Sequence, residues 1–251
     1  MSLCRAHMAT FPARIESLKI ALKSLEPQVD EIHLVLNEYS EMPSFLGKFK
    51  KVIPIMPDED FKDVGKFWPT PEPDDFVFLV DDDLRYHDRY CDWMIKMATE
   101  VGLEKNVVGL HGSIFRKNNG IPTRKRKLFY YSKSLARSIC VDELGTGTVL
   151  AKGKNIAPLS YMASSQKFVD VRYAKWCFEN NLTRICVARP RKLIHTIRNS
   201  GPSIYKTFTS SNPPQIFDEM VSYAGKSPNL GKKFGRRLSF MESVGLNLQQ
   251  S

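Results

Sequence analysis

The chain has 251 residues, of which 42% are hydrophobic, 11% aromatic and 25% charged, a composition that excludes a largely disordered protein. No window approaches the roughly 18 apolar residues of a membrane-spanning helix, and the N-terminus lacks the apolar stretch of a signal peptide. The net charge of +10 favours a polyanionic partner: nucleic acid, anionic lipid, a nucleotide or an acidic glycan. Five cysteines without zinc spacing fit a reducing cytoplasm, so a cytoplasmic protein is expected.

The first half of the chain alternates apolar runs with amphipathic segments. The run at 76–80 is apolar without interruption, as in a strand that is covered on both faces. The order of segments predicts an α/β sandwich with a largely parallel sheet. Strands are predicted at 4–9, 31–36, 51–55, 76–80 and 107–110, and helices at 14–25 and 88–101.

The second half is less regular. Residues 116–127 contain six basic residues, a glycine and a proline, and are predicted to form a mobile loop. From residue 225 onward the chain is rich in Gly, Lys and Arg, which predicts a domain at 1–224 followed by a basic tail at 225–251. Further strands are predicted at 139–141, 148–151 and 184–187, and helices at 166–180 and 214–223.

The acidic triplet Asp81-Asp82-Asp83 is the strongest candidate for a binding site, because it follows the apolar run directly. Ligands of open α/β sheets bind beyond the carboxyl ends of the strands. Three adjacent carboxylates repel one another unless a cation compensates, and Mg²⁺ or Mn²⁺ prefers a few carboxylates together with phosphate oxygens. The triplet therefore favours a metal-nucleotide site. The alternative is an acidic turn that caps the following helix.

Three shorter motifs are candidates for contacts with a nucleotide or sugar. Lys66 would neutralise a phosphate, and Asp63 would accept hydrogen bonds from a base or ribose. The glycines of Gly145-Thr146-Gly147 allow close packing beside a sugar or phosphate, and His111-Gly112 closes a predicted strand. The respective alternatives are a surface turn, a β-turn and a structural histidine. The sequence has neither a P-loop nor a G-x-G-x-x-G motif, which argues against a dinucleotide fold.

Asp170 is the candidate for proton chemistry, because it lies among apolar residues of a predicted helix, where burial would raise its pKa. Lys167 precedes it by three residues and would share its helix face. The alternative is a surface salt bridge between Asp170 and Lys167 or Arg172.

Taken in order, several motifs resemble the GT-A glycosyltransferases, and among them the bacterial α-N-acetylglucosaminyltransferases of heparosan capsules. The resemblance covers about residues 7–190 and is much weaker beyond. It implies a GT-A fold with a single mixed sheet flanked by helices, a nucleotide-binding half at about 4–112 and an acceptor half at about 113–224. The motifs that carry it are Met8-Ala-Thr-Phe-Pro-Ala-Arg14, Leu36-Asn37-Glu38, Lys62-Asp-Val-Gly-Lys-Phe67, Asp81-Asp-Asp83, Val108-Gly-Leu-His-Gly112, Leu144-Gly-Thr-Gly-Thr148 and Ser165-Gln-Lys-Phe-Val-Asp-Val-Arg172.

The resemblance also implies a reaction and its residues. The enzyme would move N-acetylglucosamine from UDP-N-acetylglucosamine to the non-reducing end of a uronate-containing capsular polysaccharide, with retention and an α linkage. Asp81 and Asp83 would hold Mn²⁺ or Mg²⁺, with His195 as a further candidate ligand, and Asp170 would stand near the reacting centre. The residues expected to bind the UDP-sugar are Thr10, Pro12, Arg14, Asn37, Asp63, Lys66, Asp81, Asp82, His111, Gly112, Gly145, Thr146 and Gly147.

Two basic segments are expected to bind anionic partners. The side chains expected to hold the acceptor's carboxylates are Arg124, Lys125, Arg126, Lys127, Lys167 and Arg172. The tail is expected to dock on a second glycosyltransferase or on anionic lipid at the inner face of the cytoplasmic membrane. The alternatives are a solvated charge run and a plain disordered tail.

Other functions stay open at this point. One is transfer from a different UDP-sugar such as UDP-galactose, since the acidic triplet does not read the sugar. Another is a non-catalytic basic module that binds a glycan or nucleic acid. Nucleic acid is not expected, because the acidic triplet would repel phosphates in the absence of a cation.

Overall fold

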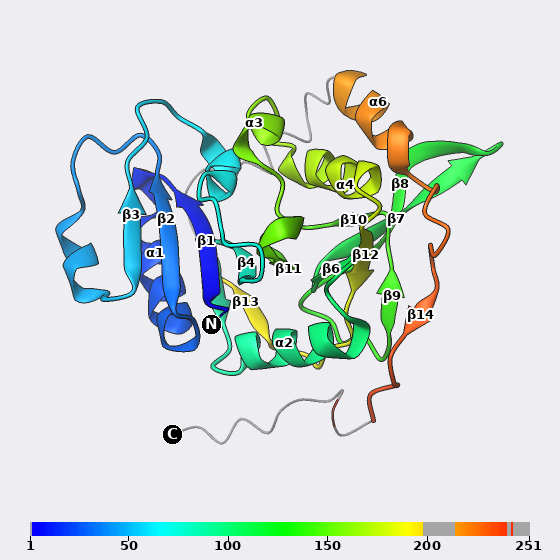
Figure 1. Cartoon of the computed structure of the whole chain (residues 1–251), viewed down its shortest axis with the longest axis horizontal. Coiled ribbons are helices and arrows are strands. Elements are labelled where there is room, and N and C mark those ends of the chain that lie inside the picture. The colour runs from blue at the N-terminus through cyan, green and yellow to red at the C-terminus, as the bar shows by residue number, and fades with distance from the viewer. Residues whose placement is uncertain (1, 198–213, 240–241, 243–251) are drawn as a thin grey trace.

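The computed structural model describes residues 2–197, 214–239 and 242. Within them the protein is α/β, with a nine-stranded mixed sheet flanked by helices, compatible with a Rossmann-like fold (Figure 1). The strand order is β14-β9-β12-β6-β11-β4-β1-β2-β3. The predicted α/β class and mixed sheet are thus confirmed. The expectation of a single sheet is wrong, because a three-stranded and a two-stranded sheet accompany the large one.

Four parallel strands form one half of the large sheet. The chain starts in the middle with β1, moves outward to β2 and β3, and then returns to the other side of β1 to form β4. The strand order therefore reverses between β1 and β4. Ligands of open α/β sheets bind at such a switch point. The strands are β1 (Cys4–Thr10), β2 (Glu31–Leu36), β3 (Val52–Ile55) and β4 (Phe76–Asp81).

The other half of the sheet is largely antiparallel. Strand β11 lies antiparallel between β4 and β6, and β9 lies antiparallel between β12 and β14. The expectation of a largely parallel sheet therefore holds for β1 to β4 and for the pair of β6 and β12, and fails at β11 and β9, because apolar periodicity indicates a strand but does not set its direction. These strands are β6 (Asn106–Gly109), β9 (Ser138–Cys140), β11 (Thr148–Lys152), β12 (Thr183–Cys186) and β14 (Lys233–Phe234).

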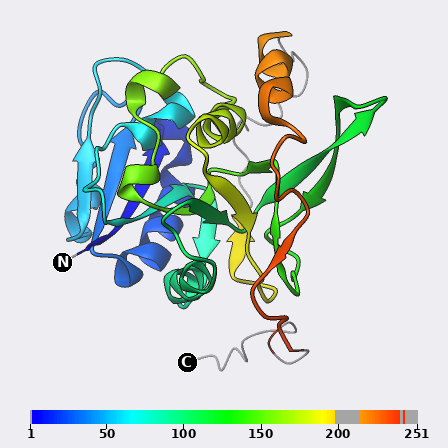
Figure 2. The ribbon, with the colours of Figure 1, turned by 45° about the vertical axis from the view of Figure 1, so that its right-hand side comes forward.

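Helices cover both faces of the sheet (Figures 1 and 2). One core cluster joins the sheet to α1 and α2, and a second joins its other face to η4, α3 and α4. Helix α6 packs against α4 in a third, smaller cluster. The α-helices are α1 (Ile15–Leu25), α2 (Tyr90–Val101), α3 (Leu159–Met162), α4 (Val169–Glu179) and α6 (Pro214–Tyr223), and the 3-10 helices are η1 (Pro12–Arg14), η2 (Glu26–Gln28), η3 (Ser44–Lys48), η4 (Lys62–Phe67) and η5 (Gly153–Asn155).

The basic segment is a β-hairpin, so the prediction of a mobile loop is wrong. Strands β7 (Gly112–Asn118) and β8 (Ile121–Phe129) pair in antiparallel fashion, and β10 (Glu143–Leu144) joins the other side of β7. Asn119 and Gly120 connect the two strands with φ angles of 48° and 81°. Two successive positive φ angles are typical of a type I′ turn, for which Asn-Gly is the strongest sequence signal.

Part of the segment that follows residue 225 packs on the fold. Strand β14 extends the large sheet beside β9, and the Leu238 main-chain amide donates to the Ala136 carbonyl over 2.8 Å. The Leu238 side chain is 5% exposed and belongs to the first core cluster. The remaining tail positions, 240–241 and 243–251, lie outside the described residues apart from Glu242, as do 198–213 of the predicted acceptor half. No helix in the described part of the chain is long and apolar enough to cross a membrane.

The buried leucine of the C-terminal segment provides a test of this packing. Leu238→Ala is expected to lower the free energy of unfolding by about 2–4 kcal/mol, because it removes buried methyl groups and leaves a cavity. Arg237→Ala is the matched control, since its side chain is exposed. Urea denaturation of the two variants measures the difference. Equal stability would show that the segment does not pack on the core in solution.

Candidate functional site

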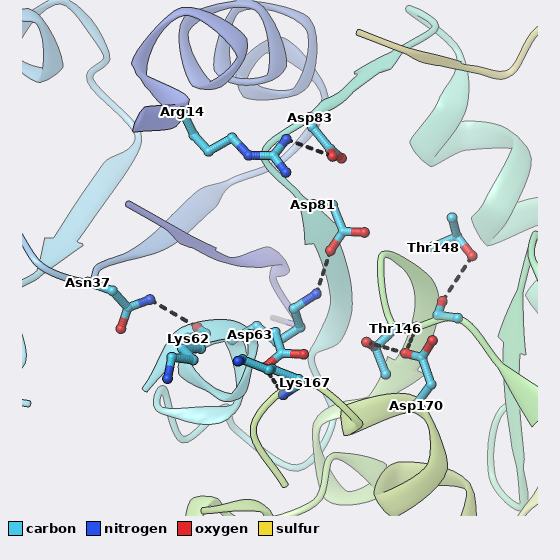
Figure 3. Close-up of polar contacts among 12 residues, drawn as sticks. Arg14, Asn37, Lys62, Asp63, Asp81, Asp83, Thr146, Thr148, Lys167 and Asp170 are labelled. Atoms are coloured by element: carbon cyan, nitrogen blue, oxygen red, sulfur yellow. Dashed lines mark hydrogen bonds and ion pairs between the residues drawn. The ribbon is translucent and has the colours of Figure 1, made fainter. Parts of the chain in front are cut away.

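Two chain segments meet at the switch point between β1 and β4. The Thr10 hydroxyl at the end of β1 donates to the Asp82 carboxylate over 2.7 Å. The Arg14 guanidinium, in the short 3-10 helix that Pro12 begins, donates to the Asp83 carboxylate over 2.8 Å (Figure 3). The structure thus brings together two motifs that lie about 70 positions apart in the sequence.

The acidic triplet connects two strands and does not cap a helix, so the capping alternative is wrong. It is followed by β5 (Leu84–Tyr86), which pairs with β13 (Ile194–Thr196), and α2 begins only after Arg89, without a side-chain cap. The buried Tyr86 hydroxyl accepts a hydrogen bond from the Asp81 amide over 2.9 Å and donates to the Asp81 carbonyl over 3.0 Å. Tyr86 therefore fixes the backbone at the start of the triplet, a role that the sequence did not reveal.

The three carboxylates have different surroundings. The Asp81 side chain is 41% exposed, whereas Asp82 is buried. Burial raises the pKa of Asp82 to about 7, although the Thr10 hydrogen bond and Arg14 act in the opposite direction. Burial and the neighbouring Asp81 also raise the pKa of Asp83. The site therefore concentrates negative charge that the protein by itself only partly neutralises.

Lys66 supplies a buried cation beside this charge. Its ammonium group lies 2.5 Å from the Asp81 carboxylate. Burial opposes the charged form, but Asp81 and, more weakly, Asp63 and Asp170 outweigh it and raise the pKa of Lys66. The surface-turn alternative is wrong, because η4 packs on the sheet. Gly65 allows this approach: a Cβ there would lie 2.9 Å from the Val35 side chain.

Asp63 and Asn37 hold the segment around η4 in place. The Lys167 amide donates to the Asp63 carboxylate over 2.8 Å, and burial raises the pKa of Asp63 to about 6. The Asn37 side chain accepts a hydrogen bond from the Phe61 amide over 3.0 Å and donates to the Lys62 carbonyl over 2.9 Å. Both polar ends of Asn37 are thus used within the chain, which makes it a support of the site; Figure 3 shows its contact with Lys62.

The β-turn that was the alternative for Gly145-Thr146-Gly147 is present at 145–148, because the Thr148 amide donates to the Gly145 carbonyl over 3.0 Å. The turn lies between two carboxylates. The Thr146 amide and hydroxyl both donate to Asp170, over 2.8 and 2.7 Å. A Cβ at Gly147 would lie only 1.8 Å from a carboxylate oxygen of Asp81. Glycine is therefore required at 147 if Asp81 is to keep its position.

The prediction that Asp170 and Lys167 share a helix face is wrong. Lys167 has a φ angle of 73° and precedes α4, which begins at Val169. The salt-bridge alternative is also wrong for Arg172, whose guanidinium pairs with Glu219 over 2.6 Å in the interior. Asp170 accepts its hydrogen bonds from the turn at 145–148 and lies at the edge of the site.

His111 lies against two aromatic rings at the same edge. Its ring centroid is 5.5 Å from that of Tyr130 and 5.8 Å from that of Tyr131. Burial lowers the pKa of His111, while Asp170 acts in the opposite direction. Gly112 packs tightly, since a Cβ there would lie 3.2 Å from Cys186. Sequence reasoning missed the two tyrosines, which have no motif around them.

The residues at the end of β4 that could contact a divalent cation are carboxylates. Asp81 and Asp83 offer carboxylate oxygens, the ligand type that Mg²⁺ and Mn²⁺ prefer. His195 lies on β13, opposite Arg85 of β5. Burial lowers the pKa of His195, and the positive charges of Arg85 and Lys192 lower it further. The described residues contain no group of three His, Cys, Asp or Glu side chains that could hold a metal. Two carboxylates completed by phosphate oxygens and water are a common way to bind such an ion.

The predicted acceptor residues are dispersed. Arg126 is paired with the buried Glu143 over 2.8 Å, and burial raises the pKa of Glu143 to about 7. Arg172 is committed to Glu219, and Lys167 contributes its main chain to Asp63. Arg126 and Arg172 thus pair with carboxylates of the fold, although Arg126 is exposed like Arg124, Lys125 and Lys127 on the same hairpin.

A scan of the chain against models of known protein families finds no match, and a search of curated proteins finds none with significant similarity.

The close contact at Gly147 can be tested by substitution. Gly147→Ala is expected to push the Asp81 carboxylate away from Lys66, because the side-chain end moves more easily than the backbone. The buried ammonium then loses its partner, which is expected to lower the free energy of unfolding by about 1–3 kcal/mol. Urea denaturation measures this. Gly47→Ala is the control, since a Cβ there would meet no atom within 4 Å. Equal effects of the two substitutions would contradict the contact.

The raised pKa of Asp82 predicts a pH dependence of stability. The folded protein holds this proton up to a pH of about 7, whereas the unfolded chain releases it near the ordinary value of 3.8. The contribution of this proton to the free energy of unfolding is therefore complete below a pH of about 4 and is lost as the pH rises towards 7. Asp82→Asn keeps an acceptor for Thr10 without the charge, and is expected to reduce this loss. Urea denaturation across this range measures it. Asp58→Asn, at an exposed position, is the control, and equal slopes in the two variants would contradict the burial of Asp82.

Proposed function

We propose that this protein is a metal-dependent glycosyltransferase that uses a UDP-sugar. The observation that carries the proposal is the switch point between β1 and β4, where Asp81 and Asp83 lie beside the cations of Lys66 and Arg14. Switch points of this kind bind nucleotides in open α/β sheets. The likeness of the sequence motifs to GT-A glycosyltransferases supports the same function.

The charges at the site are complementary to a metal-bound diphosphate. Lys66 and Arg14 now compensate Asp81 and Asp83. A divalent cation on the two carboxylates would compensate them more strongly, and would leave both basic side chains to contact the phosphates. When bound, the metal supplies positive charge next to the leaving group. Lys66 and Arg14 add positive charge of their own, which counts most in the transition state, when the departing diphosphate becomes more negative.

Asp170 is proposed to act at the sugar. Two hydrogen bonds from Thr146 hold its carboxylate, and Thr146 stands next to Gly147, which touches Asp81. This arrangement fixes a negative charge close to the proposed diphosphate site. In a reaction that retains the anomeric configuration no inverting base is needed. Asp170 would then orient the acceptor hydroxyl or stabilise the positive charge that develops on the sugar.

For the substrates we propose the assignment that the motif resemblance implies. The donor is UDP-N-acetylglucosamine, with UDP-galactose as the rival, and the acceptor is a uronate-containing capsular polysaccharide that is extended with an α linkage. The protein would act in the cytoplasm, at the inner face of the membrane where such chains are assembled, beside a second glycosyltransferase. Support for an anionic acceptor comes from the exposed cations of the β7–β8 hairpin.

A donor screen tests the proposal. The purified protein is mixed with a panel of UDP-sugars, with and without Mn²⁺, and the release of UDP is followed. We expect release with UDP-N-acetylglucosamine only when the metal is present. Asp83→Asn is expected to lower the rate about 100-fold or more, because it removes a proposed metal ligand. Asp58→Asn is the control at an exposed position. A protein that does not bind UDP with or without Mn²⁺ would refute the proposed function.

A further inference from the structure

The β7–β8 hairpin presents its cations on two faces. Side chains alternate between the faces of a strand, so Arg124 and Arg126 lie on one side of β8 and Lys125 and Lys127 on the other. Arg126 pairs with the buried Glu143, and the Arg124 guanidinium lies 5.5 Å from the centre of the Phe217 ring of α6. The first face therefore turns towards α6, which lies beyond the hairpin from His111, and Arg126 on this face is paired with a carboxylate.

The second face continues towards His111. The Lys127 ammonium lies 5.3 Å from the centre of the Phe129 ring. Tyr130 follows, with 44% of its surface exposed, and the Lys133 ammonium lies 5.8 Å from the centre of its ring. The Tyr130 ring in turn lies 5.5 Å from that of His111. Along this path two cations, Lys127 and Lys133, thus flank two aromatic rings, and the Tyr130 ring lies at the edge of the candidate site. We call this path, Lys127, Phe129, Tyr130 and Lys133, the hairpin track.

The cations of the track are available to a ligand. Among the described residues no carboxylate lies within ion-pair distance of Lys127 or Lys133. Both side chains are exposed. A cation over the face of an aromatic ring is also held in a defined direction. Two oriented, solvent-accessible ammonium groups flank two aromatic rings.

Arg189 makes the backbone of the track rigid. It is among the largest fully buried side chains, with 1% of its surface exposed. Its guanidinium donates to the carbonyls of Phe129 over 3.1 Å, of Tyr130 over 2.6 Å and of Lys133 over 3.0 Å. A buried charge is costly unless hydrogen bonds compensate it, and here main-chain carbonyls supply them. The segment that carries the aromatic rings is therefore ordered before any ligand arrives, which lowers the entropy cost of binding.

We propose that the hairpin track binds the anionic acceptor glycan and leads its end to His111. The inference rests on the proposed function and names residues that determine acceptor specificity, Lys127, Tyr130 and Lys133. The lysines would pair with uronate carboxylates, and the aromatic rings would contact the apolar faces of the sugar rings. Neighbouring side chains on one face of a strand are about 7 Å apart, which separates Lys127 from Phe129 on β8, and the turn at 130–133 adds Tyr130 and Lys133 beyond the end of the strand.

Acceptor kinetics test the proposal. The variants are Lys127→Gln and Lys133→Gln, alone and combined, and the acceptors are short and long heparosan oligosaccharides. Each single substitution is expected to raise the acceptor KM about threefold to tenfold for long chains, and much less for short ones. Release of UDP from the donor without acceptor is expected to be unchanged. Lys96→Gln is the matched control, because Lys96 also lies over an aromatic ring, 5.4 Å from Trp93 on α2.

Two further variants check the chemistry of the track. Tyr130→Ala is expected to raise the acceptor KM, whereas Tyr130→Phe keeps the ring and is expected to retain the wild-type value. An Arg124→Gln effect as large as that of Lys127→Gln would show that the whole hairpin attracts polyanions without a defined face, and would overturn the proposal.

Direct binding separates this proposal from the proposed function. Calorimetry with a long heparosan oligosaccharide is expected to show binding that Lys127→Gln and Lys133→Gln weaken, even if no UDP-sugar is turned over. A maltodextrin of the same length is the neutral control. Absence of oligosaccharide binding in a protein that does release UDP would refute the track alone. Equal or tighter binding of single-stranded RNA would also refute it.

Discussion

The candidate site depends on one electrostatic constraint, the concentration of carboxylates at the carboxyl end of β4. Asp81, Asp82 and Asp83 are consecutive, and Asp170 approaches from another element. The negative charge is compensated differently at each position. Lys66 pairs with Asp81 and Arg14 pairs with Asp83. Burial favours the protonated form of Asp82. An arrangement that needs so much compensation is well suited to bind a cation, because a bound cation relieves the repulsion.

The elements around the triplet are packed so that these charges can approach one another. Gly65 lets η4 lie against the sheet, which brings Lys66 to Asp81 in the interior. Gly147 leaves space for the same carboxylate from the opposite side. The Tyr86 hydroxyl fixes the Asp81 backbone through hydrogen bonds to its amide and carbonyl groups. Helix η4 and the turn at 145–148, which are distant from each other in the sequence, therefore converge on the Asp81 side chain, and a larger residue at Gly147 would displace it.

Much of the fold could be predicted from the sequence. The period of the apolar residues located every strand of the parallel half and both helices, α1 and α2, that cover one face. The prediction failed where the apolar pattern is weak. The basic hairpin has charged side chains on both faces, so its only local signal is the Asn119-Gly120 turn. Strand β14 has two residues, and its place beside β9 follows from packing of distant segments such as Leu238.

The candidate site was predictable as a set of motifs but not as an arrangement. The sequence could indicate that the Asp81–Asp83 triplet ends a buried strand, because an apolar run and the charges after it are local features. It could not indicate that Lys66 pairs with Asp81 or that Arg126 pairs with Glu143. Nor could it indicate that Lys127 lies on the hairpin track whereas Arg126 lies on the other face of β8.

The sequence by itself determined the elements, since propensity and periodicity act over a few residues. Only the tertiary structure decided which charges meet and which stay exposed, because that depends on strand order and on the faces that packed strands turn towards their neighbours.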